Sequence, residues 1–222
     1  MSLPIHQLTK KELVELSFWR CSHGHNGLSH YPCWLREGKP QEKTCILDIE
    51  NFGRESAPWS VILCWGIKEY GKDNIKQGYL TKSDLKHKDL DKRLVKECVD
   101  ELRQYKVIIT YCGTRWDIPI LRSKALHYGI DFPEYGSARH IDLYYIAKYK
   151  LKVGYCSLKN NCEYLHIPGK TNIDPSFWLK AITSANKVAV MDILDHNEKD
   201  LIITEKLFDK LRPYTKIVRR SI

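Results

Sequence analysis

Acidic residues mark three separate stretches of the sequence where carboxylates could act together. The first stretch is "TCILDIENFG", residues 44–53, in which Asp48 and Glu50 follow a run of apolar residues. On a strand, residues two apart lie on the same face, about 6–7 Å from one another. Two like charges held this close repel and raise each other's pKa. The pair therefore predicts a positive partner, either a metal ion or a basic group.

Two further stretches supply more carboxylates and a histidine. Asp117 follows an apolar run in "YCGTRWDIP", and His196 and Asp200 stand four residues apart in "HNEKDL". On a helix, this spacing puts two side chains on one face about 6 Å apart. Two divalent cations would neutralise four carboxylates, and such ion pairs catalyse phosphoryl displacement. Because the ligands would all be oxygens, the pattern predicts Mg²⁺ or Mn²⁺ rather than zinc.

Each of these residues also has a structural explanation, which the sequence leaves open. Asp48 and Glu50 could be solvated surface charges, since many such pairs are. Asp117 could cap the helix that follows it, and Asp200 could lie on an exposed helix face. His196 could also be a surface residue, although an unperturbed histidine pKa near 6.5 suits a group that accepts a proton.

A second concentration of reactive residues lies near the N-terminus, in "CSHGHNGLSHYPC". The chain has 8 Cys and 9 His, so a window of this length should hold about one of them, yet this window holds five. Zinc takes four nitrogen or sulfur ligands in a tetrahedron. We predict that Cys21, His23, His30 and Cys33 are the zinc ligands. Contacts from the histidines to nucleic acid and an ordinary polar loop are the alternatives.

Apolar periodicity predicts the elements that must position these residues. Strands are expected at 45–49, 59–67 and 107–112, with a short one near 77–80, and helices at 8–19, 90–105, 118–129, 176–184 and 187–211. Residues 140–150 are expected to begin as a strand and continue as a helix, and Ser157 to cap another helix. Strands first and interleaved helices later indicate an α/β fold with one central sheet flanked by helices.

A polar connector, "REGKPQEK", separates the Cys/His loop from the first strand. Its Gly, Pro and charges predict a domain boundary near residue 40. We therefore expect an N-terminal extension over residues 1–40, which holds the candidate zinc loop, and a larger domain over residues 41–222.

The composition limits the classes of partner that the protein could bind. At 43% hydrophobic and 28% charged residues, the chain has an ordinary globular composition. It contains neither an apolar run of about 20 residues that could span a membrane nor an apolar segment typical of a signal peptide. We therefore expect a cytoplasmic protein with no membrane partner. The net charge of +9 suits a polyanion such as nucleic acid, although solubility alone would also explain it.

The three acidic stretches, in this order, resemble the three Exo motifs of the DnaQ-like, or DEDD, 3′–5′ exonucleases of the ribonuclease H-like superfamily. "ILDIE" resembles motif one, "YCGTRWDIPIL" motif two and "HNEKDL" motif three. The resemblance covers residues 44–210. It is closest to the YprB-type branch and extends more loosely to the proofreading domains of family B polymerases. It implies a mixed central sheet and metal-dependent exonucleolytic hydrolysis of DNA or RNA from a single-stranded 3′ end.

The resemblance also implies roles for the motif residues. Asp48, Glu50 and Asp200 would hold one of two Mg²⁺ or Mn²⁺ ions, and Asp48 and Asp117 the other. His196 would orient the attacking water or accept its proton. The substrate-binding residues would be Asn51, Phe52, Gly53 and Trp116.

The sequence departs from the family pattern at three places. Cys112 stands where motif two usually has Asn, and Trp116 where it usually has Phe or Tyr. His196 has the spacing to Asp200 that is typical of the tyrosine-bearing branch. All four carboxylates are present, so we expect an active enzyme, with Asp142 as a nearby structural acid rather than a ligand. A structure-specific endonuclease on the same fold and a nucleic-acid-binding module with an idle acidic site are the alternatives.

Overall fold

The chain forms two compact units, residues 1–42 and 43–222. The computed structural model describes residues 8–35, 42–53, 56–169, 171–215 and 220–221. Within this part of the chain, no helix combines the length and apolar character needed to cross a membrane. The division falls two residues beyond the predicted boundary, at the start of the first strand.

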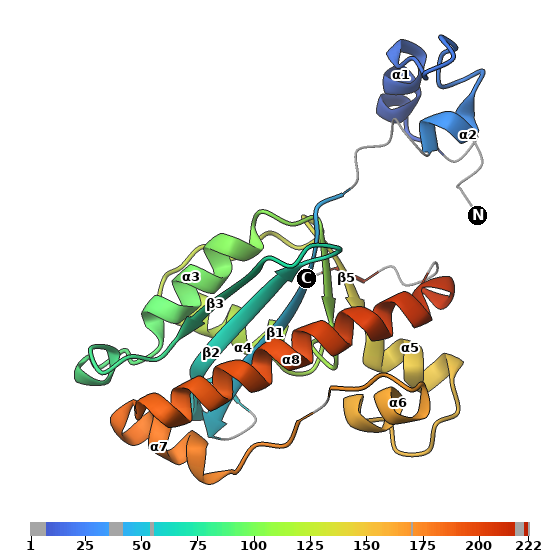
Figure 1. Ribbon diagram of the computed structural model, residues 1–222. Helices are drawn as coiled ribbons and strands as arrows, with labels where there is room; N and C mark the ends of the chain where they lie inside the picture. Colours follow the sequence, from blue (N-terminus) through green and yellow to red (C-terminus); the bar gives the residue numbers. More distant parts are fainter. Residues whose placement is uncertain (1–7, 36–41, 54–55, 170, 216–219, 222) are drawn as a thin grey trace. The chain divides into compact units, whose positions relative to one another are not determined.

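A mixed six-stranded sheet forms the centre of the larger unit, in the order β3-β2-β1-β4-β5-β6 (Figure 1). The strands are β1 (Thr44–Gly53), β2 (Ser60–Glu69), β3 (Ile75–Tyr79), β4 (Val107–Thr110), β5 (Arg139–Asp142) and β6 (Arg220–Ser221). β1 is antiparallel to β2 and parallel to β4, so the sheet changes strand direction at β1. With its flanking helices, this sheet confirms the predicted ribonuclease H-like α/β fold.

Helices cover both faces of the sheet (Figure 1). α3 (Lys92–Leu102) and α4 (Asp117–His127) pack on one face. The long helix α8 (Lys187–Leu211) crosses the other, and α5 (Leu143–Lys150), α6 (Leu158–Tyr164) and α7 (Ser176–Ser184) pack against it. Short 3₁₀ turns, η3 (Ala57–Trp59), η4 (Asp84–Lys86) and η5 (Arg212–Tyr214), complete this unit.

The alternation of β1 decides which way the acidic residues point. Ile46 packs in one buried cluster with Leu201 of α8, whereas its neighbour Leu47 packs in another with Leu94 of α3. Since successive side chains on a strand point to opposite faces, Asp48 and Glu50 share the face of Ile46. β1 therefore directs both carboxylates toward α8.

The predicted elements are present, and the differences lie at their ends. β1 continues four residues beyond the apolar run that predicted it, to Gly53, because it pairs with β2 as far as Ser60. Gly53 has a φ of 116°, and a Cβ there would lie 2.1 Å from the carbonyl oxygen of Trp59, so the end of this hairpin requires glycine. β4 is shorter than predicted because the chain turns after Thr110.

The smaller unit contains α1 (Lys10–Phe18) and the one-turn helix α2 (Tyr31–Cys33). Thr9 caps α1: its Oγ1 accepts a hydrogen bond from the Glu12 N–H, and the Glu12 carboxylate accepts one from the Thr9 N–H at 2.9 Å. This reciprocal capping box fixes the start of the helix.

Candidate active site

Asp48 and Glu50 lie on the central strand β1, beside a local irregularity. The pairing of β1 with β2 shifts register between Glu50 and Asn51. Such a bulge bends the strand and re-aims the side chains next to it. Both carboxylates are half-buried on the face that α8 covers.

Asp117 is the first residue of α4, and its carboxylate is fixed to β1. Its Oδ1 accepts a hydrogen bond of 2.9 Å from the backbone N–H of Ile49, the residue between Asp48 and Glu50. Burial raises the pKa of Asp117 to about 7, and the charge of Asp142 acts in the same direction, whereas backbone hydrogen bonds oppose the shift. A desolvated carboxylate is thus held beside the β1 pair.

Helix α8 brings the third acidic stretch to the same place. His196 Nε2 lies 3.7 Å from Glu50 Oε1 and 3.9 Å from Asp200 Oδ2, so the imidazole lies between carboxylates from two elements. On the other side of the ring, Nδ1 lies 2.9 Å from the hydroxyl of Thr171. The hydroxyl fixes the ring orientation and keeps Nε2 directed at the acidic cluster.

Asn197 links α8 to β1 directly. Its side-chain amide donates to the carbonyl and the carboxylate of Asp48. A Cβ at Gly66, the residue opposite Asp48 on β2, would lie 2.1 Å from the Asn197 Oδ1. The helix approaches the sheet this closely because Gly66 has no side chain.

The turn before Asp117 has an unusual backbone conformation. Cys112 has a φ of 66°, in the left-handed region, and Asp142 accepts hydrogen bonds from the N–H groups of Cys112 and Thr114 at 2.8 and 2.9 Å. Asp142 also accepts one from the N–H of Tyr144. These three bonds bear out its expected structural role. Trp116 packs against the buried core.

A groove of about 470 Å³ opens beside the acidic cluster, where β1 ends. Its described lining residues are Asn51, Phe52 and Gly53 from β1, and Ile173, Pro175 and Trp178 from the segment that leads into α7 and from α7 itself. The Trp178 ring also lies edge-on to His196, with 6.3 Å between centroids. Three of the four predicted substrate-binding residues therefore share this groove, and Trp116 is not among its described lining residues.

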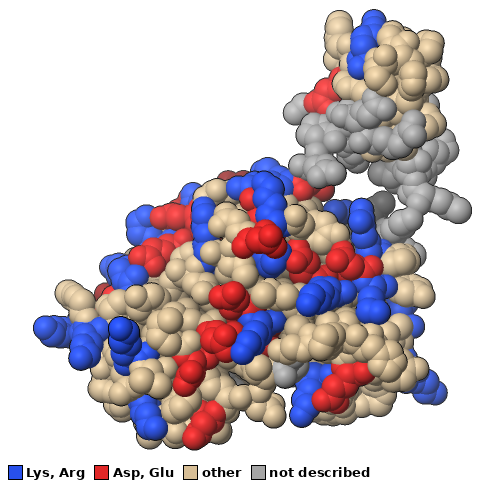
Figure 2. Space-filling view, in the orientation of Figure 1, with Lys and Arg blue, Asp and Glu red and all other residues tan. Residues whose placement is uncertain are grey.

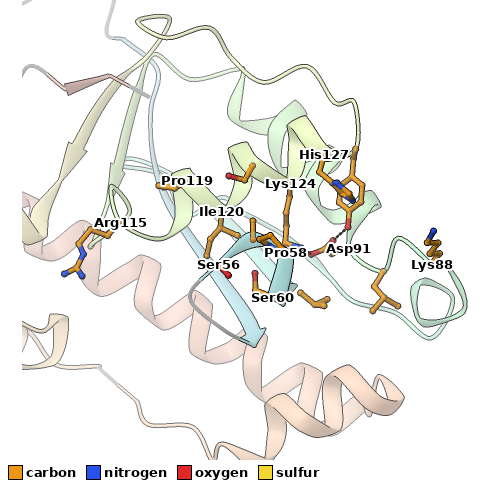
Figure 3. A pocket seen from close by; sticks show the side chains of 15 residues that line it. Ser56, Pro58, Ser60, Lys88, Asp91, Arg115, Pro119, Ile120, Lys124 and His127 are labelled. Atoms are coloured by element: carbon orange, nitrogen blue, oxygen red, sulfur yellow. Dashed lines mark hydrogen bonds and ion pairs between the residues drawn. The ribbon is translucent and has the colours of Figure 1, made fainter.

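A second cavity, of about 640 Å³, lies against α4 (Figure 3). Asp91, in its wall, accepts hydrogen bonds from the Tyr128 hydroxyl at 2.5 Å and the Ile62 N–H at 2.8 Å, and pairs with Lys124 Nζ at 2.7 Å. Figure 3 shows Arg115 at the opposite end of the lining from Lys88. Asp91 thus ties α4 to β2 and is separate from the acidic cluster.

Surface charge does not single out one binding face in the view of Figure 2. Lys and Arg side chains are interspersed with Asp and Glu over this face of the larger unit, rather than gathered in one patch. The positive excess therefore identifies no binding path on this face.

The donor set of the cluster fits a hard divalent cation. The acidic side chains that β1, α4 and α8 bring together offer carboxylate oxygens, which Mg²⁺ and Mn²⁺ prefer. Burial is the largest cause of the raised pKa of Asp117. A bound cation would favour its ionised form.

Three residues of this site were missed by the sequence analysis. They are Thr171, which contacts His196; Trp178, in the groove; and Asn197, which holds Asp48. Asn197 directly follows His196, and its place on the buried face of α8 could have drawn attention to it. Thr171 and Trp178 carry no comparable signal, because only the fold brings their segment to the cluster.

The comparison with protein families matches residues 45–212 to the model of the RNase H superfamily. Among curated proteins, the chain is similar to a DNA polymerase of Methanocaldococcus jannaschii, with 26% identity over 183 residues. The alignment covers 81% of this chain and 10% of the polymerase, so the chain spans about a tenth of that relative.

The comparison with solved structures points to the same fold. The family B DNA polymerase from the hyperthermophilic archaeon Pyrobaculum calidifontis aligns with a TM-score of 0.62 and 18% identity. The aligned region covers 78% of this chain and 25% of the polymerase. At this identity the likeness concerns the fold alone.

Proposed function

The chain belongs to the RNase H superfamily, and from this premise we propose that it is a metal-dependent 3′–5′ exonuclease of the DnaQ-like, DEDD type, in the YprB-type branch. Its substrate is the single-stranded 3′ end of DNA or RNA. The products are nucleoside monophosphates, released by hydrolysis of the terminal phosphodiester bond.

One observation carries the proposal: three acidic stretches far apart in the sequence meet beside the middle of β1. Asp117 bonds to the backbone between Asp48 and Glu50, and His196 lies within 4 Å of both Glu50 and Asp200. Acidic residues that served only as surface charges or helix caps would not need to lie close together. The proximity of so many carboxylates is unfavourable unless cations compensate it.

The carboxylates divide between two cation positions in this proposal. Asp48, Glu50 and Asp200 would hold one ion, and Asp48 and Asp117 would hold the other. Two bound divalent ions would supply the positive charge that acidifies a water and stabilises the leaving oxygen of an in-line displacement. Asn197 keeps the Asp48 carboxylate turned toward α8.

His196 is positioned to take the proton of the attacking water. If Nδ1–H donates to the Thr171 hydroxyl, the neutral ring presents the lone pair of Nε2 to the acidic cluster. A base held in this orientation is already aligned for proton transfer. Its location between Glu50 and Asp200 also stabilises the imidazolium that forms.

The groove at the end of β1 takes the terminal nucleotide. Its volume, about 470 Å³, suits a group of this size, and Phe52 and Trp178 offer apolar faces to a base. Stacking on an aromatic side chain contributes about 1–3 kcal/mol per base. Because stacking is tolerant of sequence, the enzyme would degrade different sequences at similar rates.

The decisive assay uses 5′-labelled single-stranded DNA and RNA with Mg²⁺, Mn²⁺ or EDTA. Wild type should give a ladder of shortened products with either ion and none with EDTA. Asp48→Asn, which removes one charge and keeps the shape, should reduce hydrolysis to background. Asp100→Asn, an exposed acid on α3 that pairs with Lys96, is the matched control and should match wild type.

The same assay separates the alternatives. A circular single strand should resist the enzyme, because it offers no 3′ end; its cleavage would instead identify a structure-specific endonuclease. Retarded mobility of the strand without products under any metal condition would identify a nucleic-acid-binding module. Either result overturns the exonuclease proposal.

A further inference from the structure

The N-terminal unit has too small an apolar core to explain its fold. Its described residues bury four apolar side chains, Leu16, Cys21, Cys33 and Trp34, and two of these are cysteines. Chains below about 40 residues usually need a metal or disulfides to fold. Cys21 and Cys33 are not joined by a disulfide, so a disulfide does not supply the missing stability.

The four ligand atoms that the sequence singled out lie together. Cys21 Sγ lies 3.7 Å from His23 Nδ1 and 3.6 Å from His30 Nδ1, and Cys33 Sγ lies 3.8 Å from His23 Nδ1. All four ligand atoms lie within 4.8 Å of one another. In a zinc tetrahedron, bonds of about 2.3 Å to sulfur and 2.0–2.1 Å to nitrogen separate S from N by about 3.5 Å. The observed spacing is close to this value.

The local backbone is built to make the ligands converge. Cys21 and Gly24 close a tight turn through the hydrogen bond from Gly24 N–H to the Cys21 carbonyl, and Gly24 has a φ of 81°. This turn brings His23 back beside Cys21. The one-turn helix α2 then brings Cys33 next to His30, with the Cys33 N–H bonded to the His30 carbonyl at 3.0 Å.

The fifth residue of the loop has a different place. The His25 ring packs against the ring of His30, with 4.4 Å between centroids, and is not a member of the converging group. It therefore supports a ligand rather than acting as one. The ligand set is two sulfurs and two nitrogens, which suits zinc rather than the hard cations of the acidic cluster.

We propose that Cys21, His23, His30 and Cys33 bind one Zn²⁺, with both histidines ligating through Nδ1, and that this ion stabilises the fold of the N-terminal unit. The site is independent of the proposed nuclease centre, because its ligands all lie within residues 21–33 and its chemistry differs. Metal binding replaces the thiol protons, so zinc uptake releases protons.

The test uses the full-length chain. Metal analysis after purification should find about one zinc per chain in wild type, and cobalt substitution should give the charge-transfer and d–d absorption of a tetrahedral thiolate site. Cys33→Ser and His23→Asn should lose most of the zinc. Cys156→Ser, which alters a thiol of the larger unit, and His87→Asn, at an exposed histidine of the same unit, should retain it.

A second readout keeps the test valid if the ligand variants fold poorly. After a zinc chelator is added to wild type, the rate of proteolytic cleavage within residues 9–34 should rise at least tenfold, while residues 43–212 should remain resistant. The double variant Asp48→Asn with Asp200→Asn should keep its zinc even if the nuclease proposal fails. Wild type that takes up neither zinc nor cobalt, or Cys33→Ser that retains a full complement of zinc, would overturn the proposal.

Discussion

The side-chain amide of Asn197 donates two hydrogen bonds to Asp48, one to its backbone carbonyl at 3.2 Å and one to its carboxylate Oδ2 at 2.8 Å. The two residues are 149 positions apart in the chain. Asn197 is fully buried, and its own Oδ1 accepts a hydrogen bond from Gln77 at 3.1 Å. The contact fixes both the position of α8 on the sheet and the orientation of the central carboxylate.

Asn197→Ala should therefore impair both stability and activity. Loss of a buried hydrogen-bond partner should lower the free energy of unfolding, measured by urea denaturation, by about 1–3 kcal/mol. Loss of a group that orients a metal ligand typically costs about 10–100-fold in metal affinity or activity, measured by Mg²⁺ titration of the rate. Gln77→Ala is the control, because it removes a contact to Asn197 and leaves the bonds to Asp48. An Asn197→Ala enzyme with the wild-type Mg²⁺ dependence would contradict this role.

Thr171→Val tests the orientation of His196. Valine keeps the shape of threonine and removes the hydroxyl that lies 2.9 Å from Nδ1. If His196 is the base, His196→Ala should lower kcat by about 10²–10⁴-fold, and Thr171→Val by less, with KM little changed. The pH–rate profile of Thr171→Val should shift as well, since the hydroxyl stabilises one tautomer.

Thr183→Val is the matched control for that variant. The Thr183 hydroxyl bonds the carbonyl of Leu179 on α7 and does not contact the site. Its kcat and pH profile should equal those of wild type. A Thr171→Val enzyme that behaves in the same way would remove Thr171 from the mechanism.

Trp178→Leu should weaken substrate binding. Leucine preserves much of the packing of Trp178 against the core but offers no ring for a base. The loss of about 1–3 kcal/mol of stacking predicts a KM for short oligonucleotides roughly 5–150-fold higher. Tyr135→Leu, at an aromatic residue that is 84% exposed, should leave KM unchanged. Equal KM values for Trp178→Leu and wild type would place the nucleotide outside the groove.

The stability of the larger unit should depend on pH through Asp84. Arg93 lies 2.6 Å from this carboxylate and, with Thr81, lowers its pKa from 3.8 to about 2. Because the unfolded chain binds this proton more tightly than the folded one, the stabilisation is complete above about pH 4 and is lost as the pH falls toward 2.

Asp84→Asn should accordingly reduce the free energy of unfolding by about 1–2 kcal/mol at pH 7, a value that allows for the partial exposure of Arg93. The difference from wild type should shrink at pH 3, as measured by urea denaturation at both values. Asp100→Asn should show no difference at either pH, since its ion pair with Lys96 is exposed. A difference for Asp84→Asn that is independent of pH would exclude the ion pair as its cause.

The turn at Cys112 shows how a neighbouring element holds an unusual backbone conformation. Its φ of 66° lies in a region that Asn adopts more readily than Cys. The Asp142 carboxylate accepts hydrogen bonds from the N–H groups of Cys112 and Thr114 and holds the turn in this conformation. The structure thus explains how the turn before Asp117 is kept with cysteine at this position.

Local patterns determined much of the architecture. Apolar periodicity over α7 and α8 predicted their bounds, 176–184 and 187–211, because each helix must bury one face. The order of the acidic stretches predicted a ribonuclease H-like fold, and the excess of Cys and His predicted one cluster of ligands near the N-terminus.

The tertiary structure alone decided which side chains complete the site. Thr171, Trp178 and Asn197 have no distinctive spacing. Thr171 and Trp178 contact His196, and Asn197 contacts Asp48, which is 149 positions away. The close approach of α8 at Gly66 likewise depends on two elements at once. The periodicity of apolar residues shows which face a helix or strand buries. It does not show which residues of another element that face will contact, because those contacts depend on how whole elements pack together.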